Sequence, residues 1–181
     1  DSGTSASLDL NTVTKKGLPP SFTVCTALMI KAWTNGVSTS VYIFKTEDQG
    51  GNGLISLILN VAKGLSFFKF EIRGEIFSAS LNLPWIFPLD WIHVCLSVGQ
   101  GADKIILVVD GTLLENRTFE KTKTIDYSSI SSLKIGETFT GQWVNMNIFS
   151  SLLSVEKMKN ITTAGNPACE ESGDFVSWNI S

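Results

Sequence analysis

The chain has 181 residues, with 14 basic and 17 acidic side chains and a formal net charge of −3. This length predicts a single domain over residues 1–181, and the 43% hydrophobic content excludes intrinsic disorder. No segment is basic enough to predict binding to nucleic acid or to an anionic membrane. No apolar run approaches the roughly 18 residues that cross a bilayer.

Alternation of apolar and polar residues with a period of two predicts short β-strands along most of the chain. The expected strands are Phe22–Ile30, Val41–Phe44, Leu54–Leu59, Leu65–Ile72, Ile76–Leu83, Trp91–Val98, Lys104–Val109, Ser132–Ile135 and Trp143–Phe149. Asp110-Gly111 predicts a tight hairpin, and Ser154 is expected to cap one short helix near the C-terminal end. The pattern therefore indicates an all-β fold, a two-sheet antiparallel jelly-roll sandwich with one short helix.

Three N-glycosylation sequons begin at Asn116, Asn160 and Asn179, and each is followed two residues later by Thr or Ser. Together they favour a secreted protein or the extracellular part of a membrane protein. We expect any secretory signal to have been removed before Asp1. The chain also has three cysteines. Disulfides are expected in that compartment, whereas three buried free thiols would be the alternative in a cytosolic protein.

Several stretches, taken in order, resemble the pentraxin family within the laminin-G-like and legume-lectin-like jelly rolls. They are Ser21–Cys25, Trp91–Cys95, Lys104–Gly111, Leu133–Glu137, Phe139–Gly141, Val144–Phe149 and Ser151–Glu156. The resemblance implies that Cys25 and Cys95 form the family's intradomain disulfide. Cys169 is then a free thiol, half of an interchain bridge, or the partner of a cysteine outside this chain. The ends look short for the family, which implies a trimmed domain of a larger protein or a shortened variant.

The resemblance also directs attention to calcium, because some pentraxins bind it through acidic loops. Glu137 lies where the family's main acidic loop would begin, and Glu47, Asp48 and Asn52 belong to an earlier loop. These four residues are the calcium candidates of the chain. They offer fewer than the six to eight oxygen ligands that calcium prefers, and no other cofactor is expected.

The sequence has few candidates for catalysis. His93, the single histidine, lies mid-strand and is interpreted as a packing residue rather than a catalytic base. Glu71 and Glu75 would suit a glycoside hydrolase only on one continuous strand. The Arg73-Gly74 turn between them instead indicates solvated charges at a hairpin.

An unusual aromatic stretch places Trp85 and Phe87 between two prolines. Prolines hold such a connection in irregular backbone. The two aromatic side chains are predicted either to cover an edge of the sandwich or to form the rim of a ligand site, where they would stack on a sugar or a protein partner.

These features lead us to expect an extracellular recognition or adhesion module without enzymatic activity. Its partner would be a glycan, a lipid headgroup or a protein, and its setting a receptor ectodomain or a soluble immune factor. A membrane would be reached only through a parent chain. The alternatives are a structural domain that self-associates, since pentraxins form rings, and a glycoside hydrolase on the same fold.

Overall fold

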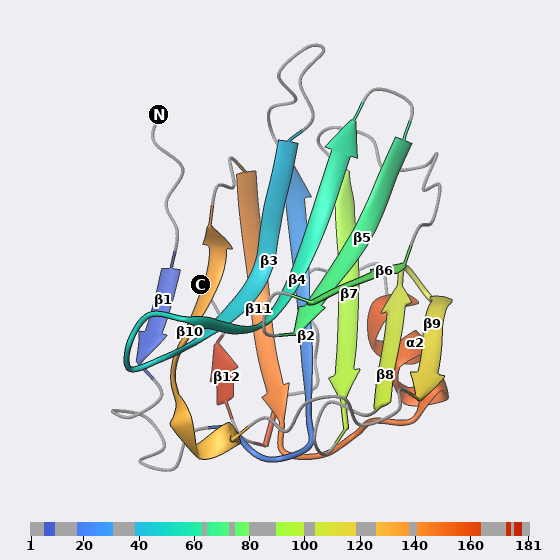
Figure 1. Cartoon of the computed structure of the whole chain (residues 1–181). Coiled ribbons are helices and arrows are strands. Elements are labelled where there is room, and N and C mark those ends of the chain that lie inside the picture. Colours follow the sequence, from blue (N-terminus) through green and yellow to red (C-terminus); the bar gives the residue numbers. More distant parts are fainter. Residues whose placement is uncertain are drawn as a thin grey trace. The chain divides into compact units, whose positions relative to one another are not determined.

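Two six-stranded antiparallel sheets and one α-helix account for most of the regular structure in the computed structural model (Figure 1). The structure describes residues 6–9, 18–30, 39–62, 65–72, 75–79, 90–99, 104–118, 126–137, 141–163, 173–174 and 176–178. The chain divides into two compact units. Within the described residues, no helix has the length and apolar character needed to cross a bilayer.

Unit 1 comprises Asp1–Gly17, Ile30–Asp90 and Asp126–Gly141. Its sheet has the strand order β1-β10-β3-β4-β5-β6. The bounds are β1 Ala6–Asp9, β3 Thr39–Asp48, β4 Gly53–Ala62, β5 Leu65–Ile72, β6 Glu75–Ala79 and β10 Ile130–Glu137, with a 3-10 turn at Tyr127–Ser129 before β10. The largest side chains fully buried in this unit are Phe44, Ile55, Leu57, Leu59, Phe68, Ile130 and Leu133. They fill one face of the sheet and explain the period-two pattern.

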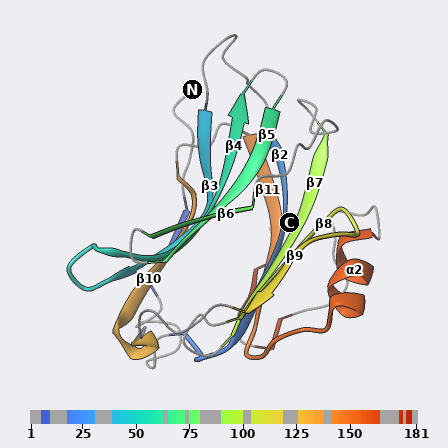
Figure 2. The same ribbon diagram turned by 45° about the vertical axis from the view of Figure 1, so that its right-hand side comes forward.

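Unit 2 comprises Leu18–Met29, Trp91–Ile125 and Gln142–Ser181. Its sheet has the order β12-β11-β2-β7-β8-β9. The bounds are β2 Phe22–Ile30, β7 Trp91–Val98, β8 Lys104–Val109, β9 Thr112–Thr118, β11 Gly141–Phe149 and β12 Val176–Trp178. Helix α2, Val155–Thr163, lies beside β8 and β9 in both ribbon views (Figures 1 and 2).

The structure confirms the all-β class and the short helix, and it extends several predicted strands. β3 continues to Asp48, beyond the predicted end at Phe44, because its last residues pair with β10 although they are polar. β6 ends at Ala79, and the rest of the predicted strand Ile76–Leu83 lies outside the described residues. Ser154 caps α2 as predicted, since its Oγ accepts the backbone N–H of Lys157 at 3.2 Å.

The predicted Asp110-Gly111 hairpin joins β8 to β9. Both residues have positive φ, 44° at Asp110 and 73° at Gly111, as the tightest hairpin turns require. The backbone N–H of Gly111 donates to Thr162 Oγ1 of α2 at 3.0 Å. The turn is therefore fixed by the helix as well as by its own strands.

Candidate functional site

A row of charged and polar side chains crosses four neighbouring strands of unit 1. Register pairing places Lys134 of β10 beside Lys45 of β3, and Lys45 beside Ser56 of β4. Ser56 in turn pairs with Glu71 of β5. Paired residues of antiparallel strands share one face of the sheet, as do residues two apart on one strand. We call this set the charged row: Lys45, Glu47, Ser56, Lys69, Glu71 and Lys134.

Ion pairs hold the charged row in place. Glu47 receives Lys45 Nζ at 2.8 Å on one carboxylate oxygen and Lys134 Nζ at 2.8 Å on the other. Lys69 pairs with Glu71, and Ser56 Oγ lies 3.4 Å from the Glu71 carboxylate. The three lysine side chains keep between 24% and 34% of their surface exposed.

Glu47 is the buried centre of this row, with 6% of its surface exposed. Burial by itself would raise the pKa of the carboxyl group. The hydrogen bonds and charges of Lys134 and Lys45 outweigh that effect and hold the pKa of Glu47 below its ordinary value of 4.5. Glu47 is therefore a carboxylate at neutral pH, and it orients two lysines.

An aromatic ring adjoins the charged row. Tyr42 of β3 pairs with Ile58 of β4, which lies two residues from Ser56 and so on the same face. Lys45 Nζ lies 5.9 Å from the centroid of the half-buried Tyr42 ring. Charged groups beside an aromatic ring provide both polar and apolar contacts of the kind that recognise a polar ligand.

The calcium candidates fall into separate environments. Asp48 closes the β3–β4 turn, where its Oδ1 accepts the backbone N–H groups of Gly50 at 2.8 Å and Asn52 at 2.9 Å. The Asn52 side-chain amide also donates to both Asp48 oxygens. Glu47 is occupied by the two lysines of the charged row. The structure thus brings Asp48 and Asn52 together, and both serve the turn.

Glu137 lies far from that turn along the same strand pair. Ile130, at the start of β10, pairs with Asp48, whereas Glu137, at its end, pairs with Tyr42. Glu137 lies seven positions along β10 from Ile130, which is about 23 Å of strand. The sheet register therefore separates Glu137 from Asp48 and Asn52. Among the described residues, no group of three His, Cys, Asp or Glu side chains is arranged to hold a metal ion.

In unit 2 the predicted disulfide is present. Cys25 and Cys95 are direct register partners on β2 and β7, with an S–S distance of 2.04 Å and a Cα–Cα distance of 4.1 Å. Both residues are buried in an apolar cluster beneath α2, to which the helix contributes Met158 and Ile161. The bridge closes a separation of 70 residues. In the chain-entropy treatment a loop of that length stabilises the fold by about 4 kcal/mol.

A hydroxyl group on the same face anchors the segment that leads into α2. Thr23 Oγ1 donates to the Ser151 carbonyl at 2.8 Å and accepts the Leu153 N–H at 3.0 Å. It also lies 2.7 Å from Ser97 Oγ, and that hydroxyl contacts Met158 Sδ at 3.3 Å. These buried polar contacts fix the helix on β2 and β7.

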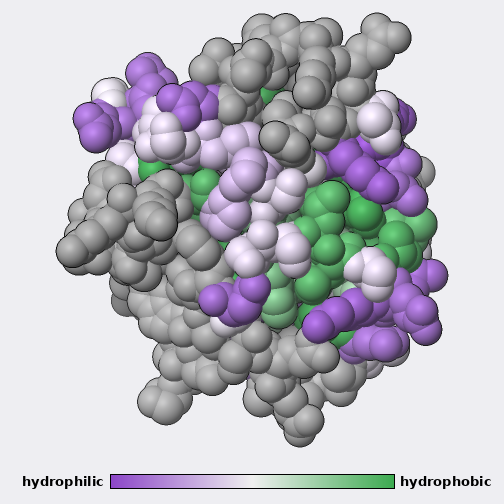
Figure 3. Space-filling view, turned by 90° about the horizontal axis from the view of Figure 1, so that it is seen from below, coloured by the Kyte–Doolittle hydropathy of each residue, from purple (hydrophilic) through white to green (hydrophobic). Residues whose placement is uncertain are grey.

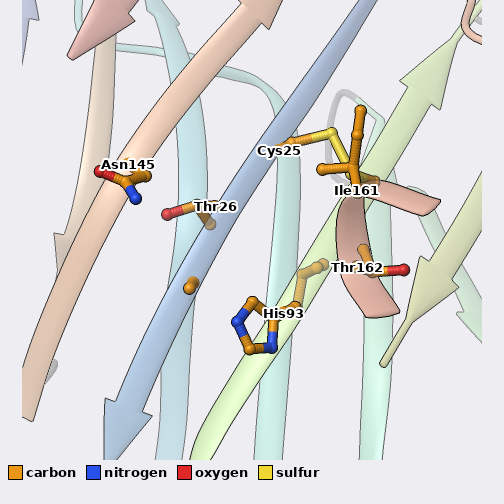
Figure 4. A pocket seen from close by; sticks show the side chains of 9 residues that line it. Cys25, Thr26, His93, Asn145, Ile161 and Thr162 are labelled. Atoms are coloured by element: carbon orange, nitrogen blue, oxygen red, sulfur yellow. A yellow bond between two sulfur atoms is a disulfide. The ribbon is translucent and has the colours of Figure 1, made fainter. Parts of the chain in front are cut away.

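A small recess of about 10 Å³ adjoins the disulfide (Figure 4). His93 forms one wall, and its Nδ1 lies 3.3 Å from Asp110 Oδ1. The same oxygen accepts the His93 backbone N–H at 2.8 Å. His93 Nε2 is buried and has no hydrogen-bond partner among the described residues. Cys95, whose thiol a Cys-His site would require, is bonded to Cys25.

The carboxylate pair of the hydrolase hypothesis is divided between two strands. Glu71 lies on β5 and pairs with Ile76, whereas Glu75 begins β6 and pairs with Ile72. The two residues therefore do not share one continuous strand, in agreement with the turn predicted between them. Glu71 is instead paired with Lys69 in the charged row.

The remaining predicted site residues divide into two groups. Asn116 on β9 and Asn160 on α2 are exposed. Trp85, Phe87, Cys169 and Asn179 lie outside the described residues. The sequence did not predict the charged row, because the order of residues does not specify the cross-strand register that brings its members together.

Apolar side chains contribute little fully exposed surface. Seen from below, hydrophobic residues gather in a patch bordered by hydrophilic ones (Figure 3). Of the large hydrophobic side chains whose burial is described, only Leu113 is classed as exposed, at 37%.

No known protein-family profile matches the chain, and no curated protein matches it in sequence. Solved structures do match. A heptameric pentraxin from Limulus polyphemus has a TM-score of 0.67 and 15% identity, over 90% of this chain and 79% of the pentraxin chain. The extracellular region of zebrafish Gpr126/Adgrg6 has a TM-score of 0.63 and 14% identity, over 96% of this chain and 24% of the receptor chain.

A third match is botulinum neurotoxin type C, in a structure described by its interaction with two ganglioside molecules. Its TM-score is 0.61 at 10% identity, over 90% of this chain and 40% of the toxin chain. At these identities the matches establish the fold alone. The chain is pentraxin-like, a jelly-roll sandwich of the kind that laminin-G-like domains share, as its sequence had predicted.

Proposed function

We propose that the chain is an extracellular recognition module that binds a glycan through the charged row and Tyr42. The supporting observation is the row itself: lysines and glutamates from three strands are oriented by ion pairs on one sheet face, with Ser56 of a fourth strand between them. The preformed positions of these groups reduce the ordering that a polar ligand would require on binding.

The fold supports the same proposal. One neighbour is a pentraxin, a second is the extracellular region of a receptor, and the third is a toxin described by its interaction with gangliosides. The Cys25–Cys95 disulfide suits an oxidising, extracellular compartment. Binding through these side chains involves no nucleophile and no general base. We therefore propose that the module binds its ligand without catalysing a reaction on it.

A glycan array tests this function. The secreted chain is applied with Ca²⁺ and again with a chelator, alongside Lys69→Ala and Lys134→Ala. We expect selective binding that each substitution weakens roughly 10-fold, the effect of losing one charge-assisted hydrogen bond. Lys159→Ala, which removes an exposed lysine of α2, is the matched control and should bind like the wild type.

Two further arms separate the other ligand classes. Vesicles with and without ganglioside test for a lipid headgroup, and a panel of cell-surface proteins tests for a protein partner. Binding only to a protein, or equal binding by all lysine variants, would contradict the glycan proposal. Turnover of any glycan on the array would contradict the non-enzymatic reading.

A further inference from the structure

Two of the predicted modification sites lie on one face of unit 2. Asn116 of β9 pairs with Ile106 of β8. Ile106 belongs to the apolar cluster that Met158 and Ile161 of α2 cover. Because register partners share a face, Asn116 lies on the side of the sheet that carries α2. Asn160 is exposed on the helix itself.

We propose that Asn116 and Asn160 carry N-linked glycans, and that these glycans cover the α2-bearing face of unit 2. This inference rests on the extracellular location in the proposed function. N-linked glycans are bulky and hydrophilic, and α2 already contacts β9, so two glycans here would occupy adjoining surface. Ligand recognition is then left to another surface, which agrees with the placement of the charged row in unit 1.

The chemistry needs one co-reactant, a lipid-diphosphate-linked oligosaccharide. A bond forms between the asparagine amide nitrogen and the anomeric carbon of the sugar, while the bond from that carbon to the diphosphate oxygen breaks. The amide loses one proton, and the lipid diphosphate leaves with the electron pair. No oxidation or reduction takes place.

The two sequons differ in the state of their threonines. Thr118 is exposed on β9. Thr162 is buried, with its hydroxyl donating to the Met158 carbonyl at 2.9 Å and accepting the Gly111 N–H at 3.0 Å. The Thr162 hydroxyl is therefore engaged once α2 has docked. Asn160 must accept its glycan before that step, and a test should change Asn160 rather than Thr162.

The first measurement is site occupancy in the chain secreted by mammalian cells. All proteins carry Asn179→Gln, so that the third sequon does not contribute. Peptide N-glycosidase converts each glycosylated asparagine to aspartate, which peptide mass spectrometry detects. We expect conversion at Asn116 and at Asn160, and the loss of one glycan from the intact mass in each of N116Q and N160Q. An unconverted asparagine at either site would overturn the inference.

The second measurement tests coverage of the face. A bulky amine-reactive polymer is used to label the protein before and after deglycosylation. Labelling of Lys159, one residue from Asn160, should accelerate several-fold after the glycans are removed. Labelling of Lys69 in the charged row should not change. Equal labelling rates of Lys159 in the glycosylated and deglycosylated proteins would overturn the proposal that the glycans cover this face.

Neither readout depends on the ligand. Secreted protein that binds a glycan but carries no glycan at these sites would refute this inference and leave the proposed function standing. Occupied sites on secreted protein that binds no glycan on the array would support this inference and refute the proposed function.

Discussion

Thr162 accepts the backbone N–H of Gly111 at 3.0 Å and so joins helix α2 to the turn between β8 and β9. The two residues are 51 positions apart in the chain. The contact ties the helix to the outer hairpin of the sheet in unit 2, on the same face as the disulfide. Three of the following predictions concern that face.

Gly111→Ala should destabilise the fold strongly. Gly111 has a φ of 73°, and a Cβ there would collide with Thr163 Oγ1 of α2. We expect a loss of about 2–3 kcal/mol in the free energy of unfolding, measured by urea denaturation. Gly51→Ala is the matched control, because Gly51 has a φ of 77° and no atom within 4 Å of the added Cβ. A loss at Gly111 no larger than at Gly51 would argue against the contact with α2.

Thr162→Val should cost about 1–2 kcal/mol, since it keeps the side-chain shape and leaves the Gly111 N–H without its partner. The comparison uses an Asn160→Gln background, so that loss of the sequon has no effect. Thr162→Ser keeps the hydroxyl and should recover most of the stability. Thr163→Val, at an exposed position, is the control for replacing a threonine hydroxyl by a methyl group at the end of α2, and it removes only the bond from Thr163 Oγ1 to the Lys159 carbonyl. If Thr162→Ser were as unstable as Thr162→Val, the loss of stability in Thr162→Val could not be assigned to the missing hydroxyl.

The double substitution Cys25→Ala with Cys95→Ala should lower the free energy of unfolding by about 4 kcal/mol, because it removes a cross-link over 70 residues. Urea unfolding of the oxidised wild type and the double variant measures the difference. Non-reducing peptide mapping of the wild type should recover Cys25 and Cys95 in one cross-linked fragment. Free thiols at both positions would contradict the disulfide and weaken the pentraxin-like comparison.

Acid should weaken unit 1 through Glu47. Its pKa is lower in the folded chain than its ordinary value of 4.5, so its contribution to stability is present above that value. The contribution declines as the pH falls through the folded pKa. Glu47→Gln should therefore have a lower free energy of unfolding than the wild type at pH 7, and the difference between the two should become smaller in acid. Glu156→Gln on α2 is the control with an exposed carboxylate.

A similar acid dependence is expected from Asp174. The hydroxyl and the backbone N–H of Ser150 donate to its carboxylate at 2.6 and 2.7 Å and lower the pKa of Asp174 below its ordinary value of 3.8. Measurements of Glu47→Gln should therefore be repeated in an Asp174→Asn background. In that background, the difference in the free energy of unfolding between the chain with Glu47 and its Glu47→Gln variant should still narrow in acid. If it no longer depended on pH, Glu47 would not be the cause of the acid dependence.

Much of the fold could be predicted because apolar and polar residues alternate with a period of two along many of its strands. In β5, for example, the buried residues Phe68, Phe70 and Ile72 alternate with the more exposed Lys69 and Glu71, and Asp110-Gly111 has the residues that a tight turn requires. The disulfide followed from a family resemblance. β1 and β12 were missed because they have only four and three residues, too few to establish a period.

The candidate site was less predictable, because its members meet only through strand register. Lys45 and Lys134 are far apart in sequence, and neither suggests the other until β3 and β10 are paired. The same register separates Glu137 from Asp48, which the family resemblance had grouped as calcium candidates. The contact of Thr162 with Gly111 likewise depends on where α2 docks, and no local pattern specifies that position.

The most direct test of ligand recognition by the charged row is a glycan placed on the row itself. The double substitution K69N/E71T creates a sequon on β5, and Lys69 and Glu71 both keep part of their side chains exposed. The secreted variant, with the Cys25–Cys95 bridge verified, is compared with the wild type for affinity towards the best ligand on the array. We predict loss of binding in the glycosylated variant and its partial return after enzymatic deglycosylation. Wild-type affinity in the fully glycosylated variant would contradict recognition through the charged row.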